Sequence, residues 1–232
     1  MRYYIILSSF IFCLISCTKR PPNTTDPQTK LSKITDSCSY TIDGVQFICD
    51  KPSTDGRGNA GANLDTTNKS WKWDTDSIQY RVMYGLDKIS NTPAQNDGRL
   101  IIYFVKKYGK NQLINPIGGI MAPLTDTPLY LKGIQHYAID YDRFNSQDGI
   151  ALQVTNRTGT SSEILFTYID ASPFSSTTLN NDCQQNSQFE IINASKLPNG
   201  GRIIEAKFTA NLFDKNERLK RLENGYLRIN VK

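Results

Sequence analysis

Short runs in which apolar and polar residues alternate recur along the chain beyond residue 36, and this period of two is typical of β-strands. The runs cover Ile78 to Gly85, Ile150 to Val154, Ile164 to Ile169 and Phe189 to Ile192, and Leu100 to Val105 is continuously apolar, as in a central strand. Clusters of Gly, Asn, Asp and Pro separate them, and no segment keeps a helical period for three turns. The pattern therefore predicts a single all-β domain over 36–232, an antiparallel β-sandwich.

The segment from Cys38 to Cys49 predicts a β-hairpin. Asp43 and Gly44 lie between two alternating runs, and both residue types tolerate the positive φ angles of a type I′ turn. A turn centred there places Cys38 opposite Cys49, where a Cα separation of about 4.5 to 5.5 Å suits a disulfide. Three arrangements remain open: a Cys38 to Cys49 bridge with Cys183 free and buried, a pairing of Cys183 with either of them, or no bridge.

The last third of the chain predicts a closing pair of strands. Ile204, Ala206, Phe208, Ala210 and Leu212 share one face, and after a charged turn around 214–216 the segment Asn224-Gly225-Tyr226 leads into Leu227, Ile229 and Val231. This pattern is similar to the end of many uncharacterised envelope lipoproteins of Bacteroidetes-type bacteria, whose final hairpin closes a small β-sandwich. The resemblance supports the fold and implies no activity.

The N-terminus has the features of a secretory signal. Arg2 gives it a positive start, and the uncharged run from Tyr3 to Ile15 is too short for a bilayer, which takes about 20 residues. Leu14-Ile15-Ser16-Cys17 resembles the lipobox of bacterial lipoproteins. The resemblance implies that the Cys17 thiol is joined to a diacylglycerol, with fatty acids such as palmitate, and that cleavage removes residues 1–16.

The lipoprotein resemblance also indicates where the protein is held. Residues 17–35 contain Pro21-Pro22 and no aromatic residue, which is typical of a flexible linker between the lipidated cysteine and the domain. Thr18 is not the Asp that keeps some lipoproteins at the inner membrane, so the resemblance implies the outer membrane, on either its periplasmic or its surface face. The envelope is oxidising, which favours a disulfide.

Composition excludes several functional classes. With 38% hydrophobic residues and a net charge of +5 in 232 residues, the chain is neither wholly disordered nor basic enough to predict a nucleic-acid partner. Its single histidine, His136, leaves most zinc sites and Ser-His-Asp chemistry without their residues. Gly56-Arg57-Gly58-Asn59-Ala60-Gly61 matches a dinucleotide motif but lacks the strand before it and the helix after it. We expect no cofactor and no metal.

The best ligand-site candidate in the sequence is a pair of tryptophans. Trp71 and Trp73 share one face if their segment is a strand, and Asp74 and Asp76 lie beside them. On an outer face the pair would form a stacking platform for sugar rings, with carboxylates for hydroxyl groups. On an inner face the pair would belong to the core, which is where tryptophan lies more often.

A second acidic cluster surrounds Asp140. Asp140, Asp142 and Asp148 supply oxygen ligands at close spacing, but Phe144 and Asn145 break the EF-hand order, which favours a solvated loop over a calcium site. The same carboxylates suggest a carbohydrate-active hydrolase using Asp140 or Asp142 as the alternative function. The leading prediction is a non-enzymatic, lipid-anchored envelope protein. It is either a structural scaffold component or a binding module for a glycan, a surface ligand or an envelope protein.

Overall fold

The strands of this protein account for nearly all of its regular structure. The computed structural model describes residues 36–52, 63–65, 77–88, 97–114, 122–125, 127–144, 146–158, 161–171, 174–198 and 200–231. The strands are β1 (Ser37–Ile42), β2 (Val45–Cys49), β3 (Lys51–Pro52), β4 (Asn63–Asp65), β5 (Ser77–Lys88), β6 (Asp97–Gly109), β7 (Leu113–Ile114), β8 (Ala122–Pro123), β9 (Gly133–Gln135), β10 (Gly149–Thr158), β11 (Ser161–Phe166), β12 (Gln188–Lys196), β13 (Arg202–Phe213) and β14 (Leu219–Val231). Two short 3₁₀ turns, η1 (Lys110–Gln112) and η2 (Thr127–Tyr130), accompany them.

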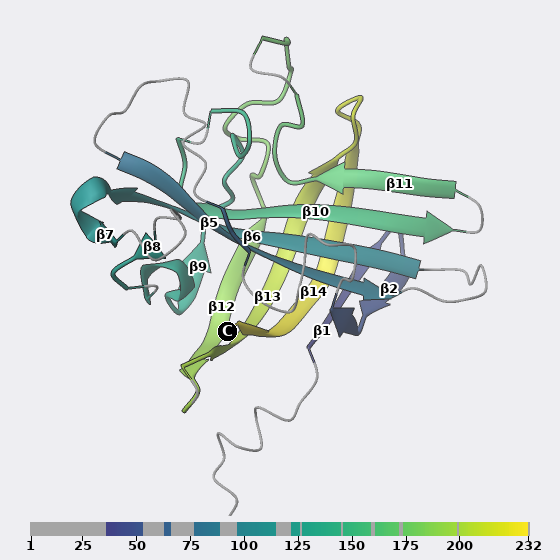
Figure 1. The fold of residues 1–232 in the computed structure, drawn as a ribbon. Coiled ribbons are helices and arrows are strands. Elements are labelled where there is room, and N and C mark those ends of the chain that lie inside the picture. The colour runs from purple at the N-terminus through teal and green to yellow at the C-terminus, as the bar shows by residue number, and fades with distance from the viewer. Residues whose placement is uncertain are drawn as a thin grey trace, which may run out of the picture.

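The main sheet has 12 strands and curls into two layers (Figure 1). β11, β10, β6 and β5 form the front layer, and β12, β13, β14, β1 and β2 form the back layer, whose strands run steeply across the front ones. One register pair, Phe166 with Phe213, joins the layers on one side. On the other side the chain itself passes between them, since β2 pairs with β1 and the following β3 pairs with β5.

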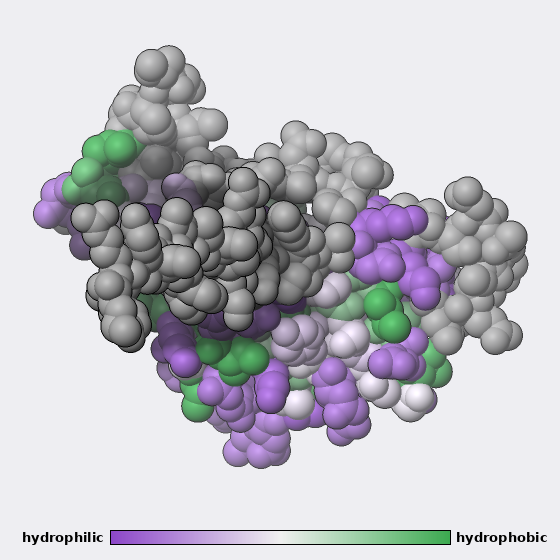
Figure 2. Space-filling view, turned by 90° about the horizontal axis from the view of Figure 1, so that it is seen from below, coloured by the Kyte–Doolittle hydropathy of each residue, from purple (hydrophilic) through white to green (hydrophobic). Residues whose placement is uncertain are grey.

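The all-β antiparallel prediction is therefore confirmed, although the two layers belong to one continuous sheet instead of two separate ones. The difference arises because Phe166 and Phe213 are neither near in sequence nor marked by any local pattern. Seen from below, the described surface is largely hydrophilic, with hydrophobic side chains in separate patches (Figure 2).

The core lies between the layers and follows the predicted alternation. The five alternating residues from Ile204 to Leu212 are all buried, as are Leu227, Ile229 and Val231. In β6, Leu100, Ile102 and Phe104 face the main core, while Val105 belongs to a second, smaller cluster on the outer side. The continuously apolar run is thus explained, because β6 is central and covered on both faces.

The predicted hairpin is present in the predicted register. Asp43 and Gly44 have φ angles of +52° and +75°, as a type I′ turn requires, and Cys38 pairs with Cys49. The predicted disulfide is absent from the structure, where both sulfurs are free, buried thiols. Strand register sets the Cα positions but leaves the thiol rotamers free, and the Cys49 Sγ lies 3.5 Å from where a Cβ at Gly98 would be.

Asp36 ties both layers together just before β1. One carboxylate oxygen accepts a hydrogen bond from the Tyr84 hydroxyl of β5, and the other accepts one from the Asn230 backbone N–H of β14 at 2.8 Å. Burial, followed by the neighbouring Asp36, raises the pKa of Tyr84. The tyrosine therefore stays a hydrogen-bond donor over the physiological pH range.

Candidate ligand-binding site

A cavity of about 470 Å³ opens between the layers, at the end of the sheet where three hairpin turns meet. We call it the mouth pocket, and it is lined by Ile42, Asp43, Val45, Phe47, Asn156, Ser161, Ser162, Glu163, Arg218 and Lys220. These residues come from the β1–β2 hairpin, the β10–β11 hairpin and the start of β14. Its volume falls within the range of small-molecule sites, about 300 to 1,000 Å³.

The floor of the mouth pocket is apolar and held by the core. Ile42 and Phe47 are buried, and the Phe47 ring stacks on Tyr40 with 5.4 Å between centroids. The Tyr40 hydroxyl donates a 3.0 Å hydrogen bond to the Asn156 side-chain oxygen. Because Asn156 is itself buried, this bond fixes an amide group at the inner end of the pocket.

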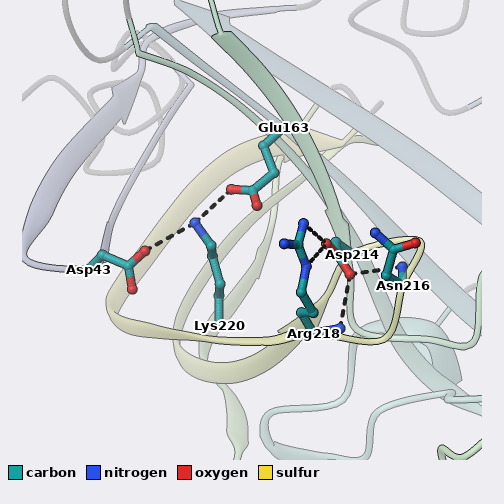
Figure 3. Close-up of polar contacts among 6 residues, drawn as sticks. All are labelled: Asp43, Glu163, Asp214, Asn216, Arg218 and Lys220. Carbon is teal, nitrogen blue, oxygen red and sulfur yellow. Dashed lines mark hydrogen bonds and ion pairs between the residues drawn. The ribbon is translucent and has the colours of Figure 1, made fainter.

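The rim of the mouth pocket is closed by an ion-pair link across two hairpins (Figure 3). The Lys220 Nζ lies 2.8 Å from a Glu163 carboxylate oxygen and 3.1 Å from one of Asp43. The hydrogen bond to Glu163 is the main cause that raises the pKa of Lys220. The position of the Asp43 carboxylate depends on the tight β1–β2 turn, because Asp43 is the first central residue of that turn.

Arg218 is neutralised in the same way on the adjoining turn. Its guanidinium lies 2.6 Å from an Asp214 carboxylate oxygen (Figure 3). Asp214 also accepts hydrogen bonds from the backbone N–H groups of Asn216 at 2.8 Å and Arg218 at 2.9 Å. The backbone hydrogen bond from Arg218 is the first cause that lowers the pKa of Asp214.

The rim of the mouth pocket therefore has no unpaired cation: Lys220 faces two carboxylates and Arg218 faces one, which leaves this group of side chains with one surplus negative charge. Because each cation on the rim has a carboxylate partner, an anionic ligand would have to break an existing pair. The side chains that remain to bind a ligand are the Ser161 hydroxyl, which shares its face of β11 with Glu163, and the amide of Asn156, above an apolar floor. This combination suits an uncharged molecule that carries several hydroxyl groups.

None of the site residues predicted from sequence is among the described residues that line the mouth pocket. Trp71, Trp73, Asp74 and Asp76 lie outside the described residues, as do the lipidation site Cys17, the linker 17–35 and the dinucleotide-like motif. The fifth cysteine, Cys183, is half-buried and free, and burial raises the pKa of its thiol to about 11.

The three aspartates of the predicted acidic cluster have separate partners. Asp140 is buried and accepts hydrogen bonds from the Ser146 N–H at 2.8 Å, the Ser146 hydroxyl at 2.6 Å and the Gln147 N–H at 3.2 Å. Asp142 lies 3.7 Å from Arg81, and Asp148 binds the Lys106 ammonium at 2.9 Å. These contacts favour a structural role for Asp140 over the catalytic one. Within the described ranges, no three His, Cys, Asp or Glu side chains form a group that could hold a metal.

Sequence reasoning missed the mouth pocket although it marked parts of its rim. From the sequence, Asp43 is only a turn residue. Arg218 and Lys220 lie in a charged segment that is equally typical of a solvent-exposed hairpin surface. Asn156 and Glu163 lie in β10 and β11, far along the chain, and carry no signal that links them to the first hairpin.

Comparison with protein-family models, with curated proteins and with solved structures gives no match. In the described part of the chain, no helix has the length and apolar character needed to cross a bilayer.

Proposed function

We propose that this protein is a lipid-anchored protein of the bacterial outer membrane whose β-domain is a non-enzymatic binding module. The lipobox-like segment Leu14 to Cys17 supports the anchor, and the Pro-containing linker to residue 35 supports a domain held away from the lipid. Fully extended, a linker of this length reaches at most about 60 Å. A domain so held meets ligands of the envelope or of the cell surface.

We propose that the mouth pocket binds one sugar unit of an uncharged glycan. The observation that carries this proposal is the pocket's lining: an apolar floor, a serine hydroxyl, a fixed amide at Asn156 and rim cations that carboxylates already pair. A pyranose ring offers the complementary surface, since it has apolar C–H groups and several hydroxyls but no net charge.

The experiment is a binding screen of the full-length protein in detergent against uncharged and acidic glycans, followed by titration calorimetry. Ser161 shares its face of β11 with Glu163 and lines the pocket, so Ser161→Trp fills the entrance with a bulky ring. We expect this variant to weaken binding of an uncharged glycan at least tenfold. Ser176→Trp, at an exposed site outside the pocket, is the matched control and keeps wild-type affinity.

Two results would contradict the mouth-pocket proposal. One is a wild-type protein that binds no uncharged glycan or prefers acidic ones. The other is a Ser161→Trp variant that folds normally and binds as the wild type does. Circular dichroism and thermal melting of each variant separate loss of binding from loss of fold.

We further propose that Cys38 and Cys49 form a disulfide once the protein reaches the envelope. The register places the two residues directly opposite each other, and an oxidising compartment supplies the conditions. The tight turn brings the two side chains opposite each other as the hairpin forms.

A further inference from the structure

We propose that the outer face of the back layer carries a second carbohydrate-binding site, which takes a stretch of an uncharged glycan chain along its surface. This second site shares no residue with the mouth pocket, and its binding does not require the mouth pocket to bind anything. It is carried by a hollow of about 510 Å³ over β12, β13 and β14, which we call the sheet-face groove.

Strand register builds the sheet-face groove from a row of side chains. Tyr226 of β14 pairs with Lys207 of β13, which pairs with Glu190 of β12, so these three residues cross the sheet side by side at about 4.8 Å spacing. A second row joins Thr209 to Gln188, and Asn224 lies at the edge of the hollow. The groove thus offers one aromatic ring, two amides, a hydroxyl and one charge of each sign.

A β-bulge shapes the bottom of the groove. The β13–β14 register shifts between Phe208 and Ala210, and Asn224 has a φ angle of +52°. Gly225 lets β14 pass close to Phe208, because a Cβ there would lie 2.5 Å from the Phe208 ring. Phe208 belongs to the main core, so it and Gly225 close the base of the hollow from the core side, and the exposed or half-buried polar residues stand around this base.

The aromatic ring of the groove is held in place from the side. The Tyr226 hydroxyl donates a 3.2 Å hydrogen bond to a Glu205 carboxylate oxygen. The other Glu205 oxygen accepts a 2.9 Å bond from the Asn193 amide, and the Arg228 Nε lies 3.5 Å from the first. Binding therefore does not have to order this side chain, which lowers the entropic cost of stacking a ligand on it.

The ligand class follows from this chemistry. A partly exposed aromatic ring beside amide, carboxylate and ammonium groups matches the C–H face and the hydroxyl rim of a sugar ring. The single Lys207 and single Glu190 leave the lining with no net charge, which disfavours a polyanion. The groove is open and shallow, unlike the mouth pocket, so it suits the interior of a chain better than a free monosaccharide. A protein partner would need a more continuous apolar area than these residues supply.

The test compares binding of full-length protein to soluble, uncharged polysaccharides (hydroxyethyl cellulose, xylan, mannan and a galactan) by affinity electrophoresis in detergent. We expect retardation by at least one of them and tighter binding of longer oligosaccharides of the same series. Tyr226→Ala is expected to lower the affinity at least tenfold, whereas Tyr226→Phe keeps the ring and loses at most about threefold. Phe174→Ala removes a ring that is 83% exposed outside the groove and is expected to change nothing.

The proposal is overturned if the wild type is retarded by none of the four polysaccharides, or if Tyr226→Ala folds and binds like the wild type. Should Tyr226→Ala fail to fold, the double variant Glu190→Ala and Lys207→Ala changes two strand-surface residues of the groove and is expected to lower affinity likewise. Ser161→Trp distinguishes the two sites, because it is expected to leave polysaccharide retardation through the groove intact even if the mouth pocket binds nothing.

Discussion

Glu217 shows how one carboxylate fixes a loop and a turn at the same time. It lies between Asp214 and Arg218 in the β13–β14 turn with a φ angle of +59°, an uncommon conformation for a residue with a side chain. Its carboxylate accepts hydrogen bonds from the hydroxyls of Thr177 and Thr178 and from the Thr178 N–H at 2.8 Å. These bonds, first of all the one from Thr177, lower the pKa of Glu217.

The lowered pKa predicts a pH-dependent contribution of Glu217 to stability. A carboxylate whose pKa falls on folding stabilises the native state above its unfolded pKa of about 4.3, and this contribution is lost as the pH falls through the folded value. Glu217→Gln is therefore expected to melt about 2–4 °C below the wild type at pH 7, with the gap closing below about pH 4. Thermal melting at pH 7, 5 and 3 checks this. An equal gap at all three values would mean that the charge of Glu217 does not matter.

Single residues also mark the limit of reasoning from sequence. Asp140 and Asp142 have the same chemistry and lie two positions apart, yet their surroundings differ. Asp140 is buried and accepts hydrogen bonds from its own loop, whereas Asp142 is exposed beside Arg81. Lys220 looks like any charged hairpin residue until Glu163 is brought to it from another strand. Partners that are distant in sequence decide these roles, and no local pattern records them.

At the scale of the element, the β1–β2 hairpin is the part that the sequence predicts best. Asp43-Gly44 specifies the turn, the turn specifies the register, and the register places Cys38 opposite Cys49. Burial raises the pKa of Cys49 to about 12, and it raises the pKa of Cys38 as well. Both groups are therefore protonated and unreactive in the folded protein, so a disulfide between them has to form before or during folding.

The proposed disulfide in the β1–β2 hairpin predicts how many free thiols the denatured protein has. If Cys17 is lipidated and Cys38 is bridged to Cys49, as we propose, protein recovered from the envelope and denatured before reaction with Ellman's reagent is expected to show one thiol, Cys183. Three thiols would show that no bridge forms. Protein expressed without residues 1–16 in a reducing cytoplasm is the control. Reduction of the bridged form is expected to cost about 2–3 kcal/mol of stability, as for other loops of this size.

For the other strands, the sequence predicts their positions along the chain more reliably than their pairing partners in the sheet. Alternation identified β5, β10, β12, β13 and β14 and the central place of β6, because half-burial imposes a period of two. The predicted run from Ile164 extends beyond the end of β11 at Phe166, since the Thr167 N–H turns to the Leu152 carbonyl at 3.0 Å. Asn224-Gly225 suggests a turn by composition but lies inside β14, where it forms the bulge.

At the scale of the whole molecule, closure of the sheet creates what the sequence could not show. The mouth pocket exists because the first hairpin, the β10–β11 hairpin and the start of β14 meet at one end of the two layers. The sheet-face groove exists because β12, β13 and β14 align in one register on the outside of the back layer. Both are products of long-range pairing, whereas the proposed anchor depends only on a few consecutive residues, Leu14 to Cys17.

The anchor therefore gives the prediction that is independent of the fold. If Cys17 carries the lipid, Cys17→Ala leaves the protein without the thioether, and the protein is expected to move from the outer-membrane fraction to the soluble envelope fraction or to persist as uncleaved precursor. Density fractionation and partition into Triton X-114 measure this, with Cys13→Ala as the matched control, because Cys13 lies in the segment to be removed. A Cys17→Ala protein that stays in the outer membrane would exclude the lipid anchor.

Protease treatment of intact cells then shows which ligands the two proposed binding sites can meet. Degradation of the wild-type domain on intact cells would place the domain on the surface, where host or environmental glycans reach both the mouth pocket and the groove. Protection until lysis would place it in the periplasm, where the ligands would have to be envelope polysaccharides, because large external chains do not cross the outer membrane. Either result determines which glycans should be tested in the binding experiments, because the location of the domain determines which glycans can reach the mouth pocket and the groove.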